Sequence, residues 1–538
     1  MLRVFALALA LLCLTSVAQA ESPATEPTTT IEEVLQQLRS RSFDDKAAAI
    51  DALAHSGHPR ADALLKALQD RRLLLDRAND RIVLGERADG GWRLHDPLSE
   101  ADLGTVESRA AAPITINNRL RRQIENLQAV VGLNNPDAAQ RRAAATSLIG
   151  TKDPDLLAAL RERRAREDNT SVAAAIDTTL NTAALYSEDS DLNARLNAIE
   201  ALSGSLEPTV RNALRSRLDS DAPSERKAVE TALKRIDART ARYQTADTLF
   251  FGLSLGSVLL LAAIGLAITF GVMGVINMAH GELIMLGAYT TFVVQQVFPQ
   301  GHEWSLLVAI PAAFLISGFV GVLIERFVIR YLYGRPLETL LATFGISLIL
   351  QQAVRVIFSP LNRSVVTPEW MSGAWQINPV FSLTFNRLYI IAFALTVFLG
   401  LLLVLKKTRL GLQVRAVSQN RQTARGLGIR SDRINALTFG LGSGIAGVAG
   451  VALAQLTNVG PNLGQAYIID SFMVVVFGGV GNLWGTLTAA FSLGIANKLL
   501  EPVSGAVLAK IFVLVFIILF IQRKPRGLFP QRGRAAEE

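Results

Sequence analysis

Hydrophobic and polar positions divide the chain into two unlike halves. Residues 21–245 are polar, rich in alanine and dense in charges of both signs, whereas residues 248–522 carry repeated apolar runs. Most of these runs are long enough to cross a bilayer whose hydrocarbon core is about 30 Å thick. The pattern predicts an all-α chain with a polytopic membrane domain over 246–530 and a separate domain before it over 21–245.

The apolar runs of the second half predict about eight or nine spans. If the first span enters from outside, alternate crossing places the basic segment 406–433 and the basic tail 523–538 in the cytoplasm, as the positive-inside rule requires. The run at 467–480 is short for a full span and favours a broken or re-entrant segment. The runs lie near 248–270, 279–298, 304–328, 338–357, 388–405, 434–456, 467–480, 484–500 and 507–522.

The first twenty residues are typical of a signal peptide. Arg3 supplies a positive start, Val4 to Leu14 an apolar stretch, and Ala18-Gln19-Ala20 a small-residue cleavage site. We therefore expect residues 21–245 to lie in the periplasm and the chain to cross a bacterial inner membrane several times. A net charge of +8 could indicate a nucleic-acid binder, but much of the excess lies in the expected cytoplasmic segments, where membrane orientation accounts for it.

A weak internal repeat runs through the exported half. Three apolar stretches, each followed by a proline and a further leucine, predict three pairs of short helices near 49–65, 144–160 and 198–214. Such pairs bury their apolar faces by stacking, so we expect an α-solenoid of the HEAT-like type. An insert at 81–93, with Asp89-Gly90-Gly91 between two alternating runs, predicts a small β-hairpin. The residues predict no metal site in this half.

The segment 406–433 is too long for a simple connector between two spans. Its basic residues outnumber its one acid, Asp432, and Val414, Val417, Ala424 and Leu427 form a small apolar stripe at helical spacing. Loops of this length inside a compact domain are usually functional. We therefore expect it to form a cytoplasmic docking surface.

Two glycine-rich stretches interrupt the apolar pattern, one early and one late in the membrane half. Paired interruptions of this kind are typical of discontinuous helices that form a polar solute site. His280 and Glu282 either contact solute or hold a broken helix in place by pairing with free backbone groups; a proton relay is the weaker alternative. The predicted pathway residues are Asn277, His280, Gly281, Glu282, Gly478, Gly479, Gly481 and Asn482.

Other polar and small residues of the membrane half have simpler interpretations. We expect Asp470 to be a solvated helix start near the outer surface, and Gln351, Gln352 and Arg355 to lie at the membrane interface. The glycines between Gly440 and Gly450 predict close helix packing.

Three segments carry a resemblance to a known family. GVMGVINMAHGELIMLGAY (271–289), RLGLQVRAVSQNRQTARGLGI (409–429) and VVVFGGVGNLWGTLTAA (474–490) are similar to the characteristic stretches of permease subunits of branched-chain amino acid ABC importers. Ordinary members begin almost directly with the first span. The long exported extension and the wording NMAHGE resemble the urea-importing branch of that family.

The resemblance implies a subunit that is not itself an enzyme. It implies a second related permease, a periplasmic solute-binding protein and two cytoplasmic ATPase subunits as partners, with ATP bound by those ATPases and no cofactor in this chain. The chain has no GxxxxGK[ST] phosphate loop, which agrees with this expectation. By resemblance, the coupling residues are Arg415, Ala416, Asn420, Ala424 and Gly428. Urea is the expected solute; branched-chain or other small amino acids, and a passive urea or amide channel, are the alternatives.

Overall fold

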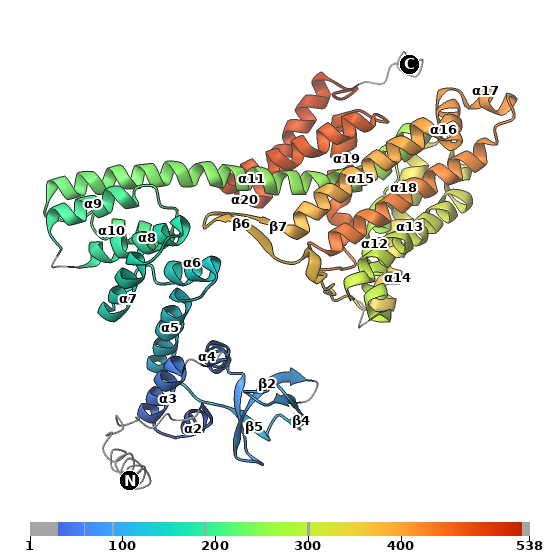
Figure 1. Cartoon of the computed structure of the whole chain (residues 1–538). Coiled ribbons are helices and arrows are strands. Elements are labelled where there is room, and N and C mark those ends of the chain that lie inside the picture. Colours follow the sequence, from blue (N-terminus) through green and yellow to red (C-terminus); the bar gives the residue numbers. More distant parts are fainter. Residues whose placement is uncertain are drawn as a thin grey trace, which may run out of the picture. The chain divides into compact units, whose positions relative to one another are not determined.

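The computed structural model describes residues 31–529 except 57, 59, 89–90, 188–189 and 299–301. The predicted signal peptide and the last part of the predicted tail lie outside these residues. The chain divides into two compact units, Met1–Ile236 and Asp237–Glu538, which we describe separately (Figure 1).

Helices of the first unit begin where the sequence offers capping side chains. The side chains of Ser42, Asp153 and Asn169 accept hydrogen bonds from free backbone amides, and Pro154 and Pro208 occupy first-turn positions. The three predicted helix pairs correspond to α3–α4, α6–α7 and α9–α10. The helices of this unit are α2 (Ile31–Gln37), α3 (Phe43–His55), α4 (Ala61–Gln69), α5 (Asn118–Leu133), α6 (Ala138–Ser147), α7 (Pro154–Ala165), α8 (Thr170–Tyr186), α9 (Leu192–Leu202) and α10 (Pro208–Arg215).

A five-stranded antiparallel sheet follows α4, so the prediction that the whole chain is α-helical is wrong in this part. The strands are β1 (Leu73–Asp76), β2 (Arg81–Ala88), β3 (Gly91–His95), β4 (Asp102–Glu107) and β5 (Ala111–Pro113), in the order β4-β3-β2-β1-β5. The predicted hairpin is its β2–β3 pair. Leu74, Val83 and Leu94 are buried together in one apolar cluster, which stabilises the sheet. The short alternating runs of the sequence predicted only one hairpin of this sheet.

The second unit is built from long apolar helices. Six helices among the described residues are long and apolar enough to cross a membrane: α11, α13, α14, α15, α18 and α20. Two shorter helices, α12 and α19, complete the set of apolar segments. The bounds are α11 (Pro223–Met273), α12 (His280–Val297), α13 (His302–Phe327), α14 (Pro336–Phe358), α15 (Phe385–Lys407), α18 (Ser431–Ala454), α19 (Leu463–Gly478) and α20 (Leu483–Arg523).

Connecting elements of the second unit are short. The 3₁₀ helices η1 (Ile329–Leu332) and η2 (Glu369–Met371) lie in the connections after α13 and α14, and β6 (Ala374–Asn378) pairs with β7 (Phe381–Thr384) before α15. Two further helices, α16 (Arg409–Gln419) and α17 (Arg421–Gly426), lie between α15 and α18.

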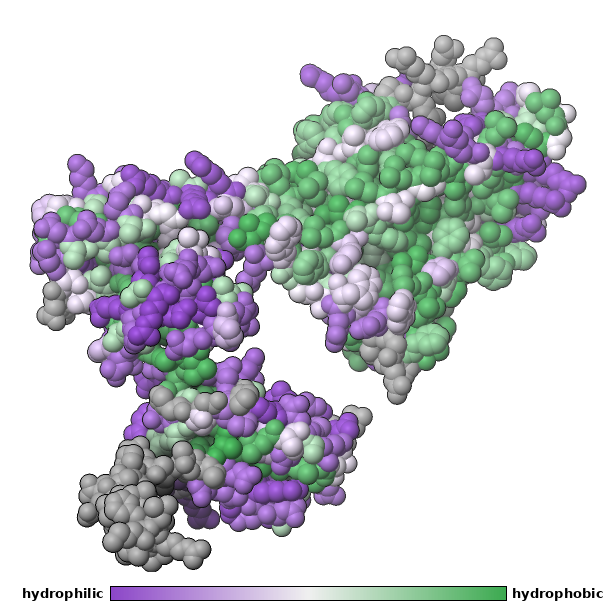
Figure 2. Space-filling model, in the orientation of Figure 1, coloured by the Kyte–Doolittle hydropathy of each residue, from purple (hydrophilic) through white to green (hydrophobic). Residues whose placement is uncertain are grey.

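Helix α18 lies at the centre of the membrane unit. Its most apolar window is 89% buried, whereas that of α20 is 17% buried and the outer faces of α13 and α14 expose many large apolar side chains (Figure 2). The glycine stripe explains the central position, because Gly442 meets the backbone of Gly265 and Gly447 meets α12 at Gly287 and α13 at Ala313. The predicted packing role of this stripe is confirmed.

Helix α20 contains the last two predicted apolar runs in a single bent element. Gly505 has a φ of 79°, outside the helical range, and separates the two runs. After the bend the chain returns to its starting point: the backbone amide of Phe529 donates to the carbonyl oxygen of Gly478, and the Asn482 side chain donates to the carbonyl oxygen of Phe529. Phe529, the last described residue, therefore lies beside the end of α19.

Candidate functional site

The start of α12 is a buried polar cluster formed by a break in the helical chain. Helix α11 ends at Met273, residues 274–279 are not helical, and α12 begins at His280. The positive φ of Gly274, 65°, allows the chain to turn back at the end of α11. Asn277 lies in this break and its side-chain oxygen accepts a hydrogen bond of 3.0 Å from the backbone amide of Ala279. The break thus places polar side chains inside an apolar helix bundle.

His280 is fully buried and fixed by one hydrogen bond. Its Nε2 lies 2.9 Å from the carbonyl oxygen of Ala262 in α11, and since a carbonyl can only accept, Nε2 carries the proton. Its Nδ1 is then an acceptor, and it has no hydrogen-bond partner among the described residues. The Nδ2 amide nitrogen of Asn277, a donor, is also buried without a partner in this part of the chain. The cluster therefore presents one free acceptor and one free donor.

Glu282 is held by a polar stripe on α14. The amide Nε2 of Gln351 donates a 2.7 Å hydrogen bond to the Glu282 carboxylate. Two turns earlier on α14, the Thr343 hydroxyl accepts a 3.1 Å hydrogen bond from the backbone amide of Met278. The stripe consists of Thr339, Thr343, Ser347 and Gln351, all buried and spaced four residues apart. We refer to Asn277, His280, Glu282 and this stripe as the α12 cluster.

The expectation that Gln351 lies at the membrane interface is therefore wrong. Gln351 is 3% exposed and points inward, whereas the neighbouring Gln352 is exposed. The four-residue spacing of hydroxyl and amide side chains in an otherwise apolar helix was the available signal, because it places all four on one face.

Gly281 belongs to the α12 cluster, but the late glycine group does not. A Cβ on Gly281 would lie 2.5 Å from the carbonyl oxygen of Gly464, so the N-terminal turns of α12 and α19 touch through their backbones. Gly478 ends α19, fourteen residues later, and Gly479, Gly481 and Asn482 follow it. At 1.5 Å per residue the two ends of α19 are about 21 Å apart. The predicted pathway residues of the two stretches, 277–282 and 478–482, thus lie in two separate groups and do not form one site, contrary to the prediction.

The late glycine group makes close contacts near the C-terminal end of α11. A Cβ on Gly271 of α11 would lie 2.3 Å from the Cα of Gly481, so the two backbones touch. Asn482 caps α20 by accepting from the backbone amides of Trp484 and Gly485. These residues hold α11, α19 and α20 together where the chain approaches α16.

Asp470 lies in the middle of α19 and not at a helix start. It is 9% exposed, and its carboxylate lies 3.2 Å from the ammonium of Lys510 in α20. The predicted solvated position is therefore wrong. An ionisable pair between two apolar helices compensates both charges, which explains how Asp470 is accommodated there.

The segment 406–433 folds into α16 and α17, each with its own cap. Thr408 accepts from the backbone amide of Gly411, and Asn420 accepts from that of Thr423. Val414, Val417 and Ala424 pack against Ile434 of α18 in a small apolar core. Three members of the predicted apolar stripe therefore face the chain's own core.

The five predicted coupling residues have internal roles in this segment. Arg415 donates to the carbonyl oxygen of Leu405, and Ala416 is half-buried against the small core. Ala424 was predicted to allow close approach of a partner, but it is 2% exposed and lies in the small core. Asn420 caps α17, and Gly428 adopts a φ of 86° that ends it.

The exposed apolar side chains of this segment are Leu412 and Leu427, at 62% and 77%. Of these, Leu427 belongs to the apolar stripe predicted for the docking surface, and Leu412 had not been singled out. Large exposed apolar side chains among charged ones are typical of contact surfaces. We call Leu412, Leu427 and the exposed polar residues between them the α16–α17 surface.

Asp432 of α18 forms ion pairs that connect the α16–α17 surface to the helices of the membrane unit. Its carboxylate lies 2.8 Å from the guanidinium of Arg425, 3.4 Å from that of Arg421 and 3.7 Å from that of Arg330. The Arg421 guanidinium also lies 4.3 Å from the ring centroid of Tyr333. Burial and a hydrogen bond to the Glu325 carboxylate raise the pKa of the Tyr333 hydroxyl. Arg421 and Arg425 therefore fix α17 against α18.

Comparison with known families agrees with this architecture. The model of the family described as the branched-chain amino acid transport system permease component matches residues 248–521. The chain belongs to this family.

Several relatives of this permease have assigned transport roles. A high-affinity branched-chain amino acid transport permease of Pseudomonas aeruginosa, BraD, is 30% identical over 295 residues, which are 53% of this chain and 96% of that protein. LivH of Escherichia coli, a permease of the same description, is 31% identical over 290 residues, 52% of this chain and 94% of that protein. A ribose import permease of Escherichia coli, RbsC, is 26% identical over 294 residues, 53% of this chain and 87% of that protein.

This permease is thus a multi-pass inner-membrane subunit of an ABC transport system. The matched residues begin at 248, so the N-terminal unit precedes the family's segment. The similarity covers the α12 cluster and the α16–α17 surface together.

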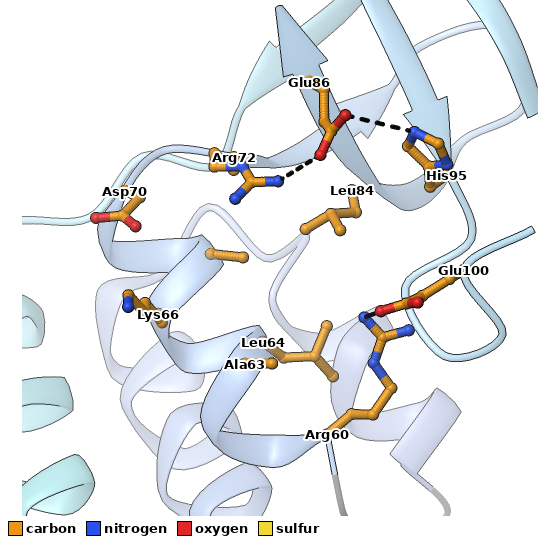
Figure 3. Close-up of a pocket in the computed structure, with 11 residues that line it drawn as sticks. Arg60, Ala63, Leu64, Lys66, Asp70, Arg72, Leu84, Glu86, His95 and Glu100 are labelled. Carbon is orange, nitrogen blue, oxygen red and sulfur yellow. Dashed lines mark hydrogen bonds and ion pairs between the residues drawn. The ribbon is translucent and has the colours of Figure 1, made fainter. Parts of the chain in front are cut away.

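The N-terminal unit has a hollow of about 460 Å³ between α4 and the sheet (Figure 3). Charged side chains lie around it, and four of them form two ion pairs: Arg60 with Glu100 at 2.6 Å and Arg72 with Glu86 at 3.0 Å. The first pair connects the start of α4 to the loop after β3, and the second connects the residue before β1 to β2. The hollow therefore presents compensated charges around an apolar floor that includes Leu64 and Leu84.

Proposed function

We propose that this permease carries urea in an ABC importer and that the α12 cluster lines the solute pathway. The observation that carries the proposal is the pair of unpartnered polar atoms in that cluster. Asn277 Nδ2 is a donor and His280 Nδ1 is an acceptor, and neither has a partner among the described residues. A urea molecule offers a carbonyl acceptor and N–H donors, which complement these two atoms and the Glu282 carboxylate.

The charge of the buried residues supports a neutral solute. Among the described residues of the membrane unit, no lysine or arginine is buried, and the buried acids and histidines are His280, Glu282, Glu325 and Asp470. An amino acid brings a carboxylate that needs a cation or several donors when it leaves water. Urea brings no charge, so it passes such a site without that requirement.

The coupling to ATP is proposed to run through the α16–α17 surface. In this account two cytoplasmic ATPase subunits bind the surface, a second related permease completes the pathway, and a periplasmic protein delivers the solute. Movement of the ATPases would shift α16 and α17, and the ion pairs of Asp432 would transmit the shift to α18 and η1. This transmission supports alternating access, in which the pathway opens first outward and then inward.

The N-terminal unit is proposed to lie in the periplasm as a HEAT-like repeat domain. Its surface is predominantly polar, as expected of a domain in water (Figure 2). We propose that it receives the solute-binding protein. Deleting residues 21–222, which leaves α11 intact, should weaken binding of that protein about tenfold; unchanged affinity and unchanged uptake would remove this role.

The experiment for the solute is uptake of labelled urea and labelled leucine by the complete complex in proteoliposomes, with and without ATP. Urea importers should accumulate urea only with ATP. Uptake of urea that persists without ATP would indicate a passive urea or amide channel.

Branched-chain amino acids are the second candidate. The observation that favours them is the transport role of BraD and LivH, which are similar to this chain over nearly their whole length. ATP-driven uptake of leucine without uptake of urea would establish that alternative and leave the role of the α16–α17 surface unchanged.

A further inference from the structure

A groove of about 450 Å³ lies beside α16 at one end of the membrane unit, separate from the α12 cluster. Its walls come from α11, α15, α16 and the start of α20. The floor is apolar and includes Ala267 and Ile268 of α11 and Leu402 of α15. The rim carries two cations, Lys406 and Arg415. A groove with an apolar floor and a basic rim fits an amphipathic anion.

The cations at the rim are not neutralised by acids of the groove. None of the residues that line it, all within the described part of the chain, is an aspartate or glutamate. Lys406 is exposed, and the Arg415 guanidinium is held beside it by donation to the Leu405 carbonyl oxygen. The hydroxyl of Ser418 and the amide of Asn482 donate to the carbonyl oxygens of Arg415 and Phe529, so the charged donors of the rim are Lys406 and Arg415. This set of donors suits a phosphate group.

The depth of the floor favours a lipid over a soluble partner. Ala267 lies six residues before Met273, the last residue of α11, and Leu402 lies five residues before Lys407, the last of α15. At 1.5 Å per residue the floor lies about 8–9 Å below the helix ends, within the hydrocarbon layer. A soluble protein would not reach this depth.

The expected position of the groove on the cytoplasmic side of the membrane favours an anionic lipid. The basic segment 406–433 faces the cytoplasm under the positive-inside rule. The cytoplasmic leaflet carries anionic lipids, and basic pockets between transmembrane helices on that side bind their headgroups. Trp484, 50% exposed at the rim and packed edge-on against Phe398, has the position of an interfacial aromatic residue.

We propose that this groove binds an anionic phospholipid of the cytoplasmic leaflet, with its phosphate at Lys406 and Arg415 and one acyl chain along Ala267, Ile268 and Leu402. The bound lipid would fill the space between α15, α16 and α20. It would thereby support the underside of the α16–α17 surface.

Trp484 provides a direct reporter for this site. The full-length chain is placed in nanodiscs that contain phosphatidylglycerol or phosphatidylcholine with brominated acyl chains, which quench nearby tryptophan fluorescence. The same measurement on Trp484→Phe isolates the contribution of Trp484 from that of the other tryptophans. Titration of each brominated lipid into unlabelled phosphatidylcholine gives its relative affinity for the groove.

The expected result is a preference for phosphatidylglycerol of about 30-fold, because each cation near the membrane surface contributes about a fivefold factor. Lys406→Gln should lower this preference about fivefold. Lys407→Gln is the matched control, since Lys407 does not line the groove, and it should leave the preference unchanged.

Two outcomes would overturn the proposal. Equal quenching of Trp484 by the two lipids would mean that the groove holds ordinary annular lipid or is covered by another subunit. An equal loss of preference in Lys406→Gln and Lys407→Gln would mean general attraction of anionic lipid to a basic surface and no site. Soluble glycerol phosphate should not displace the brominated lipid, and displacement would indicate a phosphate site without a lipid.

Discussion

The hydrogen bond between Gln351 and Glu282 is the residue-scale contact on which the α12 cluster depends most. Gln351→Leu removes the donor and leaves the carboxylate desolvated, at a cost of about 1–3 kcal/mol. We expect ATP-driven uptake to fall about tenfold or more, since about 1.4 kcal/mol corresponds to a factor of ten. Uptake by equal amounts of assembled complex is the measurement.

The adjacent Gln352 supplies the control for this change. It is exposed and follows Gln351 directly, so Gln352→Leu makes the same chemical change outside the cluster. Uptake by Gln352→Leu should equal that of the unaltered complex. Equal uptake by both variants would show that the Gln351 contact has no part in transport.

Glu167 in the N-terminal unit gives a pH-dependent prediction. Hydrogen bonds from Arg141, and then from Arg163, lower the pKa of this nearly buried carboxyl from 4.5 to about 2. Since the folded pKa is the lower one, the stabilisation is complete above pH 4.5 and is lost as pH falls toward 2. Glu167→Gln should cost about 2 kcal/mol at neutral pH.

The measurement is unfolding by denaturant of residues 31–236, expressed separately, at a series of pH values from neutral down toward 2. The difference in unfolding free energy between the original chain and Glu167→Gln should shrink as the pH falls below 4.5. A difference that is independent of pH would show that the ion pairs with Arg141 and Arg163 contribute nothing.

Some residues of the α12 cluster could be predicted from the sequence and others could not. Asn277, His280 and Glu282 stand out because they interrupt an apolar run between glycines. Gln351 does not, because a glutamine near a helix end fits an interfacial position equally well, and only the tertiary contact with Glu282 places it inside. Asp470 was misplaced for the same reason, since its partner Lys510 is forty residues away.

At the scale of elements, close backbone contact between α12 and α18 stabilises the bundle. A Cβ on Gly287 would lie 1.9 Å from the carbonyl oxygen of Gly447. Gly287→Ala should therefore destabilise the membrane unit by about 1–3 kcal/mol, the usual cost of overpacking. A lower melting temperature of the detergent-solubilised chain is the expected observation.

Gly345 in α14 is the matched position, because no atom lies within 4 Å of a Cβ placed there. Gly345→Ala should leave stability unchanged or raise it slightly, as alanine favours helix over glycine by about 1 kcal/mol. If the two variants melted at the same temperature, the glycine contact between α12 and α18 would not be a source of stability.

The α16–α17 surface makes a prediction about coupling. Leu427 is 77% exposed, so Leu427→Asp should not disturb the fold of the segment. It should lower ATP-driven uptake about tenfold if the ATPases bury this side chain, whereas Leu427→Met should retain most uptake. Co-purification of the ATPases distinguishes lost docking from lost transport, and normal uptake by Leu427→Asp would refute the role of Leu427.

The helices were easier to predict than the connections between them or the five-stranded sheet of the first unit. The apolar runs marked each long helix of the membrane half, because burial in lipid demands a continuous run. The joining of the last two runs in α20 depends on the bend at Gly505 and on the return of Phe529 to Gly478, which are tertiary features. The sheet around β1 was missed because short strands such as Leu73–Asp76 carry too little pattern to distinguish them from loops.

At the scale of the whole molecule, two halves of different chemistry are joined in one chain. The contrast in hydropathy marks the division, and the described helices and the family match support a membrane permease in the second half. The solute is not determined by this architecture. The proposal of urea rests on a few buried atoms in the α12 cluster, a free donor and a free acceptor, and on the absence of a buried lysine or arginine among the described residues of the membrane unit.

The most direct test of this account is the initial rate of ATP-driven uptake of labelled urea by the complete complex, measured beside the same complex carrying Gln351→Leu. The account predicts uptake that requires ATP, is not reduced by excess unlabelled leucine and falls about tenfold in the variant. ATP-driven uptake of leucine without urea, or urea uptake that the variant leaves intact, would contradict it.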